Sequence, residues 1–161
     1  MSTVDRTTDR TTDRTTDRTT DRATSAKVTR LRRGGSPHVT AASYIDEAER
    51  LLERARREHQ PAERITWAYR AALRGAGAAI EDVRTGKRRR TSGSAWARLR
   101  AAVPEMEDTV ERFEVYARFV ARVEMGLERE LRLSDADSFY AAVCDFIDEV
   151  RGMVGYLPEV A

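Results

Sequence analysis

The sequence has few of the residues and patterns that mark several large classes of protein. Of its 161 residues one is cysteine, four are proline and nine are glycine, and no long apolar run is free of charged side chains. A lone cysteine excludes a disulfide framework, the low glycine and proline content excludes a collagen-like chain, and the missing apolar run excludes a membrane-spanning helix. No secretory signal is expected, because no apolar stretch follows the amino terminus. These absences predict a cytoplasmic protein with no membrane association.

Histidine is scarce as well, with His38 and His59 the only two in the chain. Neither has a glutamate three residues before it, which excludes the paired Glu-x-x-His motifs of a di-iron bundle. Gly86-Lys87 does not complete a phosphate-binding P-loop, because Glu81 stands where the earlier glycine is required. We therefore predict neither a metal site nor a cofactor.

The amino-terminal part of the chain differs from the rest in composition. Asp-Arg pairs separated by Thr-Thr recur from Asp5 to Arg22, and a basic stretch around Lys27 to Arg33 follows. Nine basic and five acidic side chains give residues 1–40 a charge of +4, whereas residues 41–161 carry −2, within a total of +2. Because this region offers almost nothing to bury, residues 1–40 are predicted to be a disordered repeat tail and basic linker, and residues 41–161 the folded domain.

Apolar residues recur at helical spacing through the folded part, and no segment alternates as a strand would. Ser43 and Ser94 suit N-cap positions, Pro61 suits a first helical turn, and Ser134 with Asp137 resembles a capping box. The pattern predicts an all-α, up-and-down bundle of four long helices with one short helix bridging an end. The predicted helices cover residues 43–58, 61–83, 94–103, 104–131 and 134–157.

Several residues favour packing roles over chemistry. Gly75 and Gly77 lack the third glycine of a dinucleotide fingerprint, so they are interpreted as small residues that let the second helix approach a neighbour. Cys144 has no adjacent cation to activate it and is predicted to be a small buried hydrophobe. Trp67 and Trp96 are predicted to be core or interface anchors.

The predicted fourth helix carries apolar residues on more than one face. Val115, Tyr116, Phe119 and Val123 lie off its main stripe. Surplus apolar surface of this kind indicates a partner, and a homodimer is the simplest one.

The order of these features is similar to that of a known family. An alanine-rich helix over Ala68–Ile80 is followed by a basic linker, then Ser94-Ala95-Trp96-Ala97-Arg98-Leu99, then Pro104-Glu105 and two long helices. Over residues 43–157 this resembles the small actinobacterial branch of the HEPN-domain proteins. The resemblance implies a helical bundle, often dimeric, from a superfamily tied to RNA cleavage, RNA binding, toxin–antitoxin and defence systems. It further implies that catalytic members carry an Arg-x(4–6)-His motif on a late helix and pair two copies across a dimer.

Two groups of residues are candidate sites. Arg54 and His59 have the Arg-x(4–6)-His spacing, at the end of the first predicted helix, where they would diverge by about 140° if both were helical. Histidine can act as an acid or base near neutral pH, and arginine can stabilise phosphate charge. The second group is the basic loop, defined as Arg84, Lys87, Arg88, Arg89 and Arg90, which can attract RNA phosphates. A solvated helix end and a solvated loop are the respective alternatives.

Three functions follow from these features. The first is a HEPN-like interaction or RNA-associated module without catalysis, with RNA or a protein as partner. The second is a metal-independent ribonuclease or toxin that uses Arg54 and His59 across a dimer. The third is a purely structural helical adaptor.

Overall fold

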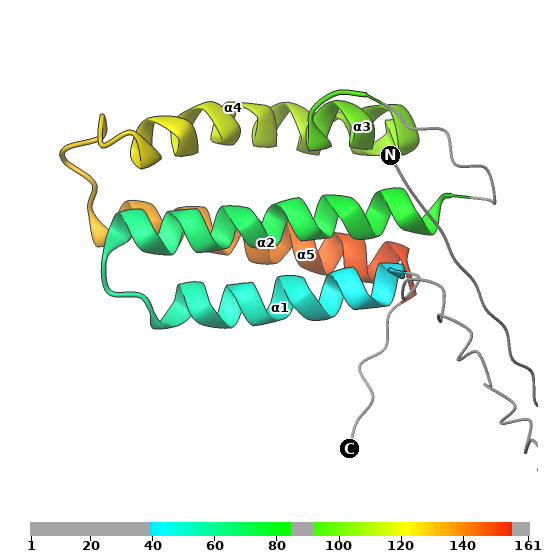
Figure 1. The fold of residues 1–161 in the computed structure, drawn as a ribbon, viewed down its shortest axis with the longest axis horizontal. Coiled ribbons are helices and arrows are strands. Elements are labelled where there is room, and N and C mark those ends of the chain that lie inside the picture. The colour runs from blue at the N-terminus through cyan, green and yellow to red at the C-terminus, as the bar shows by residue number, and fades with distance from the viewer. Residues whose placement is uncertain (1–38, 85–91, 156–161) are drawn as a thin grey trace, which may run out of the picture. The chain divides into compact units, whose positions relative to one another are not determined.

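The computed structural model of the chain describes residues 39–84 and 92–155 (Figure 1). No residue in these two ranges lies in a β strand, so the predicted all-α fold is confirmed. Of the predicted tail, only Val39 and Thr40 are among the described residues. The helices are α1 (Ala41–Arg57), α2 (Pro61–Asp82), α3 (Ala95–Ala102), the 3-10 turn η1 (Pro104–Met106), α4 (Glu107–Glu124) and α5 (Leu133–Met153).

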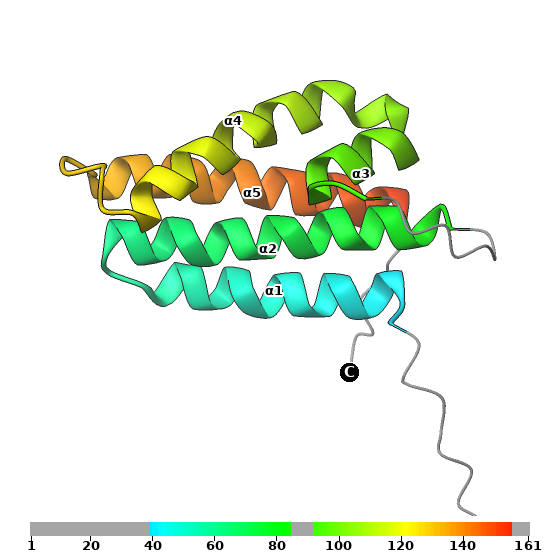
Figure 2. The same cartoon turned by 45° about the horizontal axis from the view of Figure 1, so that its top comes forward.

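The four long helices alternate in direction, as predicted for an up-and-down bundle. α1 and α4 run one way and α2 and α5 the other (Figure 1), and α4 is inclined to the other three (Figure 2). α2 is the central helix, because it packs against α1, α3, α4 and α5. α3 lies between α2 and α4 at one end of the bundle, which is the bridging position predicted for it.

Small residues on α2 bring its neighbours close. A Cβ atom added at Gly75 would lie 2.5 Å from Cδ1 of Ile147 on α5, and one added at Gly77 would lie 2.9 Å from the Tyr44 ring on α1. Both distances are shorter than a van der Waals contact, so neither site has room for a side chain. The predicted role of these glycines in close helix packing is confirmed.

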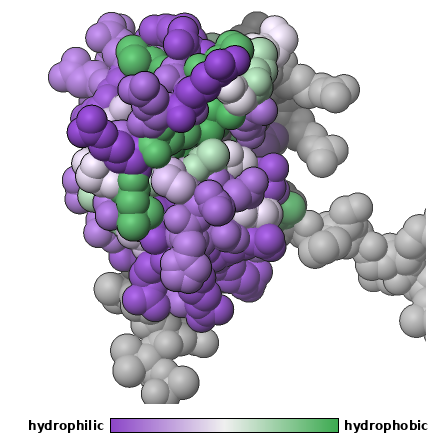
Figure 3. Space-filling view, turned by 90° about the vertical axis from the view of Figure 1, so that its left-hand side faces the viewer, coloured by the Kyte–Doolittle hydropathy of each residue, from purple (hydrophilic) through white to green (hydrophobic). Residues whose placement is uncertain are grey.

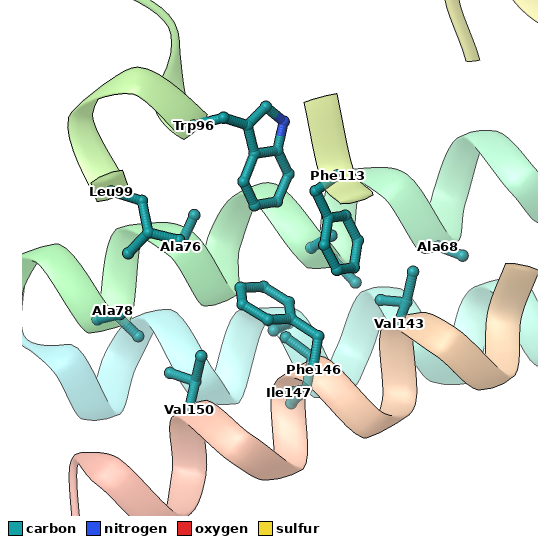
Figure 4. Close-up of a cluster of buried hydrophobic side chains, with 14 of the residues drawn as sticks. Ala68, Ala76, Ala78, Trp96, Leu99, Phe113, Val143, Phe146, Ile147 and Val150 are labelled. Atoms are coloured by element: carbon teal, nitrogen blue, oxygen red, sulfur yellow. The ribbon is translucent and has the colours of Figure 1, made fainter. Parts of the chain in front are cut away.

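Aromatic rings from α3, α4 and α5 meet in the core of the bundle (Figure 4). Trp96 of α3 stacks on Phe113 of α4 with ring centroids 4.8 Å apart, and Phe113 lies 4.7 Å from Phe146 of α5. The indole N–H of Trp96 donates to the Tyr69 hydroxyl at 2.9 Å, which satisfies the one polar atom of this buried ring. Trp96 is thus the core anchor that was predicted.

Of the first three predicted helix starts, two are confirmed and one is wrong. Ser94 accepts a hydrogen bond from the Ala97 amide, and Pro61 is the first residue of α2. Ser43 was predicted as the N-cap of the first helix, but Thr40 occupies that position and accepts from the Ser43 amide at 3.1 Å. The Ser43 hydroxyl in turn accepts from the Thr40 amide, so the two residues form a capping box and α1 begins earlier than predicted.

The predicted fourth helix is too long and is divided differently. Pro104 opens the 3-10 turn η1 rather than α4, and α4 ends at Glu124 instead of near residue 131. Gly126 has φ +69°, the left-handed conformation that ends many helices, and its amide donates to the Val123 carbonyl. The Leu127 amide donates to the Arg122 carbonyl at 2.9 Å, which completes a Schellman motif.

The start of the last helix also differs from the prediction. α5 begins at Leu133, so the capping box predicted for Ser134 and Asp137 is wrong. The Arg132 amide donates to the Asp135 carboxylate at 3.0 Å instead, and this bond satisfies the backbone at the helix start.

Most of the apolar residues assigned to a second face of the predicted fourth helix are packed inside the bundle. Val123 is buried, and Tyr116 and Phe119 contact Phe139 of α5 with ring centroids 4.9 and 6.2 Å away. Only Val115 is exposed, at 54%. The surplus apolar surface inferred from these residues is therefore wrong for three of the four, because α4 contacts more than one helix.

Candidate functional site

The candidate pair Arg54 and His59 lies where α1 meets α2. α1 ends at Arg57, Glu58 is its C-cap, and exposed His59 follows in the short connection before Pro61. Arg54 is therefore on the last turn of a helix and His59 is beyond it. The 140° divergence predicted for a continuous helix does not apply. Within the described ranges, His59 has no hydrogen bond or ion pair with another side chain.

The Arg54 guanidinium lies against an aromatic ring. Its Cζ is 3.7 Å from the centroid of the Trp67 ring, and its Nε is 4.0 Å from Oε1 of Glu58. The first distance is a stacked cation–π contact, while the second is too long for a hydrogen bond. The side chain remains 59% exposed, so one side of the guanidinium still faces solvent.

A second arginine contacts the same ring. Arg70, one turn along α2 from Trp67, has its Cζ 4.4 Å from the ring centroid. Trp67 itself is partly buried, and its Nε1 atom is buried without any acceptor in the described part of the chain. We call Arg54, Trp67 and Arg70 the indole–arginine cluster. From the sequence Trp67 was predicted only as an anchor and Arg70 was not identified, although their three-residue spacing on one helix was a usable signal.

Arg64 links the α1–α2 connection to α5 through hydrogen bonds and an ion pair. Its Nε and Nη2 donate to the Glu58 carbonyl at 3.0 and 2.7 Å, and its Nη1 pairs with Asp137 of α5. The Arg64 side chain is only 15% exposed. Asp137 is not a capping residue, because α5 begins at Leu133 and Asp135 holds the N3 position. No sequence pattern identified Arg64, because its partners lie on other elements.

The basic loop is described only at its first residue. Arg84 pairs with Glu81 at 2.8 Å and so contributes less free positive charge than predicted. Lys87, Arg88, Arg89 and Arg90 lie outside the described residues.

Cys144 and Tyr140 lie four residues apart on α5 and are both partly buried. Burial raises the pKa of the Cys144 thiol, which disfavours the nucleophilic thiolate. Burial, together with the neighbouring Cys144, raises the pKa of Tyr140 to about 12. Both groups are therefore protonated near neutral pH.

Residues 39–84 and 92–155 contain neither a metal-binding cluster nor a membrane-spanning helix. No three side chains of histidine, cysteine, aspartate or glutamate in these ranges gather as they would around a metal ion. No helix there has both the length and the apolar character needed to cross a bilayer.

Comparison with known proteins assigns the chain to a family. Searches of curated proteins and of solved structures gave no significant match. A family model described as HEPN_SAV_6107-like HEPN matches residues 55–151, from the last turn of α1 almost to the end of α5. Because this match spans more than half of the sequence, the chain belongs to the SAV_6107-like HEPN family.

Proposed function

We propose that this protein is a non-catalytic HEPN-type module that associates with RNA. The observation that carries the non-catalytic part is the position of Arg54. Its guanidinium is stacked on Trp67, and His59 lies past the end of the helix that carries Arg54. Cleavage would require these two groups to act on one phosphate, as transition-state stabiliser and as acid or base.

Two features support association with RNA. The indole–arginine cluster places two exposed arginines together at the α1–α2 junction. The sequence adds Lys87, Arg88, Arg89 and Arg90 in one short segment. Side chains of this kind bind phosphates without reading sequence, so we expect weak sequence preference and strong salt dependence.

The test is a cleavage assay with labelled RNA that contains both single-stranded and hairpin regions. We expect the wild-type chain and His59→Ala to leave the RNA intact at every protein concentration that gives binding. Cleavage by the wild type that disappears in His59→Ala would establish the alternative, a HEPN-type ribonuclease or toxin. The exposure of His59 is the observation that favours this alternative.

Replacement of Lys87, Arg88, Arg89 and Arg90 by alanine tests the RNA association separately. We expect the affinity to fall and its dependence on salt to become less steep, because fewer counterions are released from RNA. A chain that binds no RNA in either form would indicate the third function, a structural adaptor.

A homodimer remains part of the proposal. Exposed apolar side chains gather on the end of the bundle that carries the α4–α5 connection (Figure 3), where Met125, Leu127 and Leu133 are 65%, 57% and 46% exposed. Such residues are suited to packing against a second copy. Light scattering at micromolar concentration tests the prediction, and a strictly monomeric mass would contradict it.

A further inference from the structure

We infer that the indole–arginine cluster is a binding site for the phosphodiester backbone of RNA. The inference rests on the proposed RNA association and goes further by naming the residues that hold the ligand. It assigns Arg54 to binding, together with Trp67 and Arg70, rather than to catalysis.

The two arginines of the cluster have no close carboxylate. The other arginines on α1 are all paired: Arg50 lies 3.0 Å from Glu47, and Arg56 and Arg57 lie 2.9 and 2.7 Å from Glu53. Arg54 has only the long 4.0 Å approach to Glu58, and Arg70 has no ion pair within the described ranges. The cluster therefore differs from the ordinary paired surface of the same helix.

The indole N–H of the cluster is also unpaired. Nε1 of Trp67 is a buried donor with no acceptor among the described residues, whereas the same atom of Trp96 donates to Tyr69. A buried donor left unpaired costs about 1–3 kcal/mol, so its presence calls for an explanation. An oxyanion bound at the cluster would give the two guanidiniums a close acceptor, and a shift of the Trp67 ring on binding would let the same ligand accept from Nε1.

The two guanidiniums contact the same ring. Their Cζ atoms lie 3.7 and 4.4 Å from its centroid and so are at most 8.1 Å apart, which lets them hold neighbouring phosphates of one strand. Contact with the ring restricts the motion of each guanidinium, which reduces the entropy cost of a bidentate contact. Arg74, exposed and one further turn along α2, extends the positive charge along the same helix.

The phosphodiester is favoured over a carboxylate ligand by the number of oxygens. A carboxylate offers two oxygens in one plane, which one arginine fork can occupy fully. The non-bridging oxygens of successive phosphates can satisfy two forks and the indole N–H together. A repeating anionic strand also suits the additional positive charge of Arg74.

The experiment measures binding of a fluorescein-labelled single-stranded oligouridine by anisotropy over a range of salt concentrations. The test variant is Arg54→Gln/Arg70→Gln. The matched control is Arg112→Gln/Arg118→Gln, which removes the same charge from exposed positions on α4 that have no ion pair in the described ranges.

We expect the test variant to weaken binding about tenfold. The salt slope should fall by about 0.7 for every phosphate that the variant no longer neutralises. The control should change affinity less than about threefold, because screening weakens distant charges.

Trp67→Phe distinguishes the contribution of the indole N–H from that of the aromatic ring. Phenylalanine keeps a ring face for the guanidiniums but has no N–H donor. We expect about fivefold weaker binding, which corresponds to the removal of one hydrogen bond. Circular dichroism of every variant verifies the helical fold.

Each other outcome has a defined meaning. If the test variant binds RNA as well as the control does, the site is wrong while the RNA association stands. If the wild type binds no RNA, the proposed function fails, and pyrophosphate becomes the probe of the cluster. A change in tryptophan fluorescence that is absent in Arg54→Gln/Arg70→Gln would show that the cluster binds anions. No change in the wild type would overturn the anion site. Binding of polyglutamate but not oligouridine at the cluster would overturn the phosphodiester assignment.

Discussion

Single glycines on α2 set its distance from α5 and α1, as the contacts of Gly75 and Gly77 illustrate. We predict that Gly75→Ala lowers the free energy of unfolding by about 1 kcal/mol, because the new methyl group must displace buried Ile147, and this overpacking outweighs the gain in helix propensity. Chemical denaturation measures the change.

Gly152→Ala on α5 is the matched control. A Cβ atom there meets nothing within 4 Å, so the same substitution should raise the free energy of unfolding by about 0.5–1 kcal/mol. Equal effects at the two positions would contradict the packing explanation.

The Tyr140 hydroxyl gives a residue-scale prediction about pH. Its pKa is about 12 in the folded chain, against about 10 for an exposed tyrosine. Below pH 10 it is protonated in both states, and between about pH 10 and 12 only the unfolded state releases the proton, so stability falls as pH rises through this window. We expect Tyr140→Phe to show a smaller fall over the same range in pH-dependent denaturation. If the free energy of unfolding fell equally steeply with pH in the wild type and in Tyr140→Phe, the raised pKa of Tyr140 would be refuted.

Residue-scale prediction from sequence worked where the signal is local. The small-residue role of Gly75 and Gly77 follows from α2 alone, and Trp96 is recognisable as a core residue from its apolar neighbours. The partners of Arg54 are different, because Trp67 and Arg70 lie on another helix and meet Arg54 only through the antiparallel packing of α1 and α2. No spacing rule within α1 contains that information.

At the scale of elements, Arg64 joins three parts of the chain: α2, the end of α1 and the start of α5. We predict that Arg64→Ala lowers the free energy of unfolding by about 2 kcal/mol, because the Glu58 carbonyl no longer receives two charge-assisted hydrogen bonds. Thermal or chemical denaturation measures this decrease.

Asp137→Asn should lower the free energy of unfolding less than Arg64→Ala does, by about 0.5 kcal/mol. Asp137 is 56% exposed, so its ion pair with Arg64 is screened by solvent. If Asp137→Asn were as costly as Arg64→Ala, the ion pair rather than the carbonyl contact would be the important one.

Helix starts were predictable where one local signal has no competitor. The N-cap Ser94 and the first-turn Pro61 are such cases, and both are confirmed. Ser43 and Thr40 are both good caps three residues apart, and the structure uses them reciprocally, which sequence alone leaves open. The end of α4 was missed because apolar residues continue past Gly126, although the positive φ of that glycine ends the helix.

For the whole molecule, the class of fold and the order of helices follow from hydrophobic periodicity, and the family match agrees with them. The packing of α4 was harder to predict. Its aromatic residues pack toward α5, so Tyr116 and Phe119, which look surplus on one helix, are half-buried against Phe139. Burial against several helices is a property of the assembled bundle and not of any one segment.

The whole protein is proposed to hold RNA without cutting it, and one measurement tests both parts at once. End-labelled RNA is incubated with excess wild-type chain, the complex is isolated on a native gel, and the recovered RNA is run on a denaturing gel. We predict a shifted complex whose RNA is full length and whose amount falls as salt is added. Shortened RNA in the complex, or no shifted complex at low salt, would contradict the proposal.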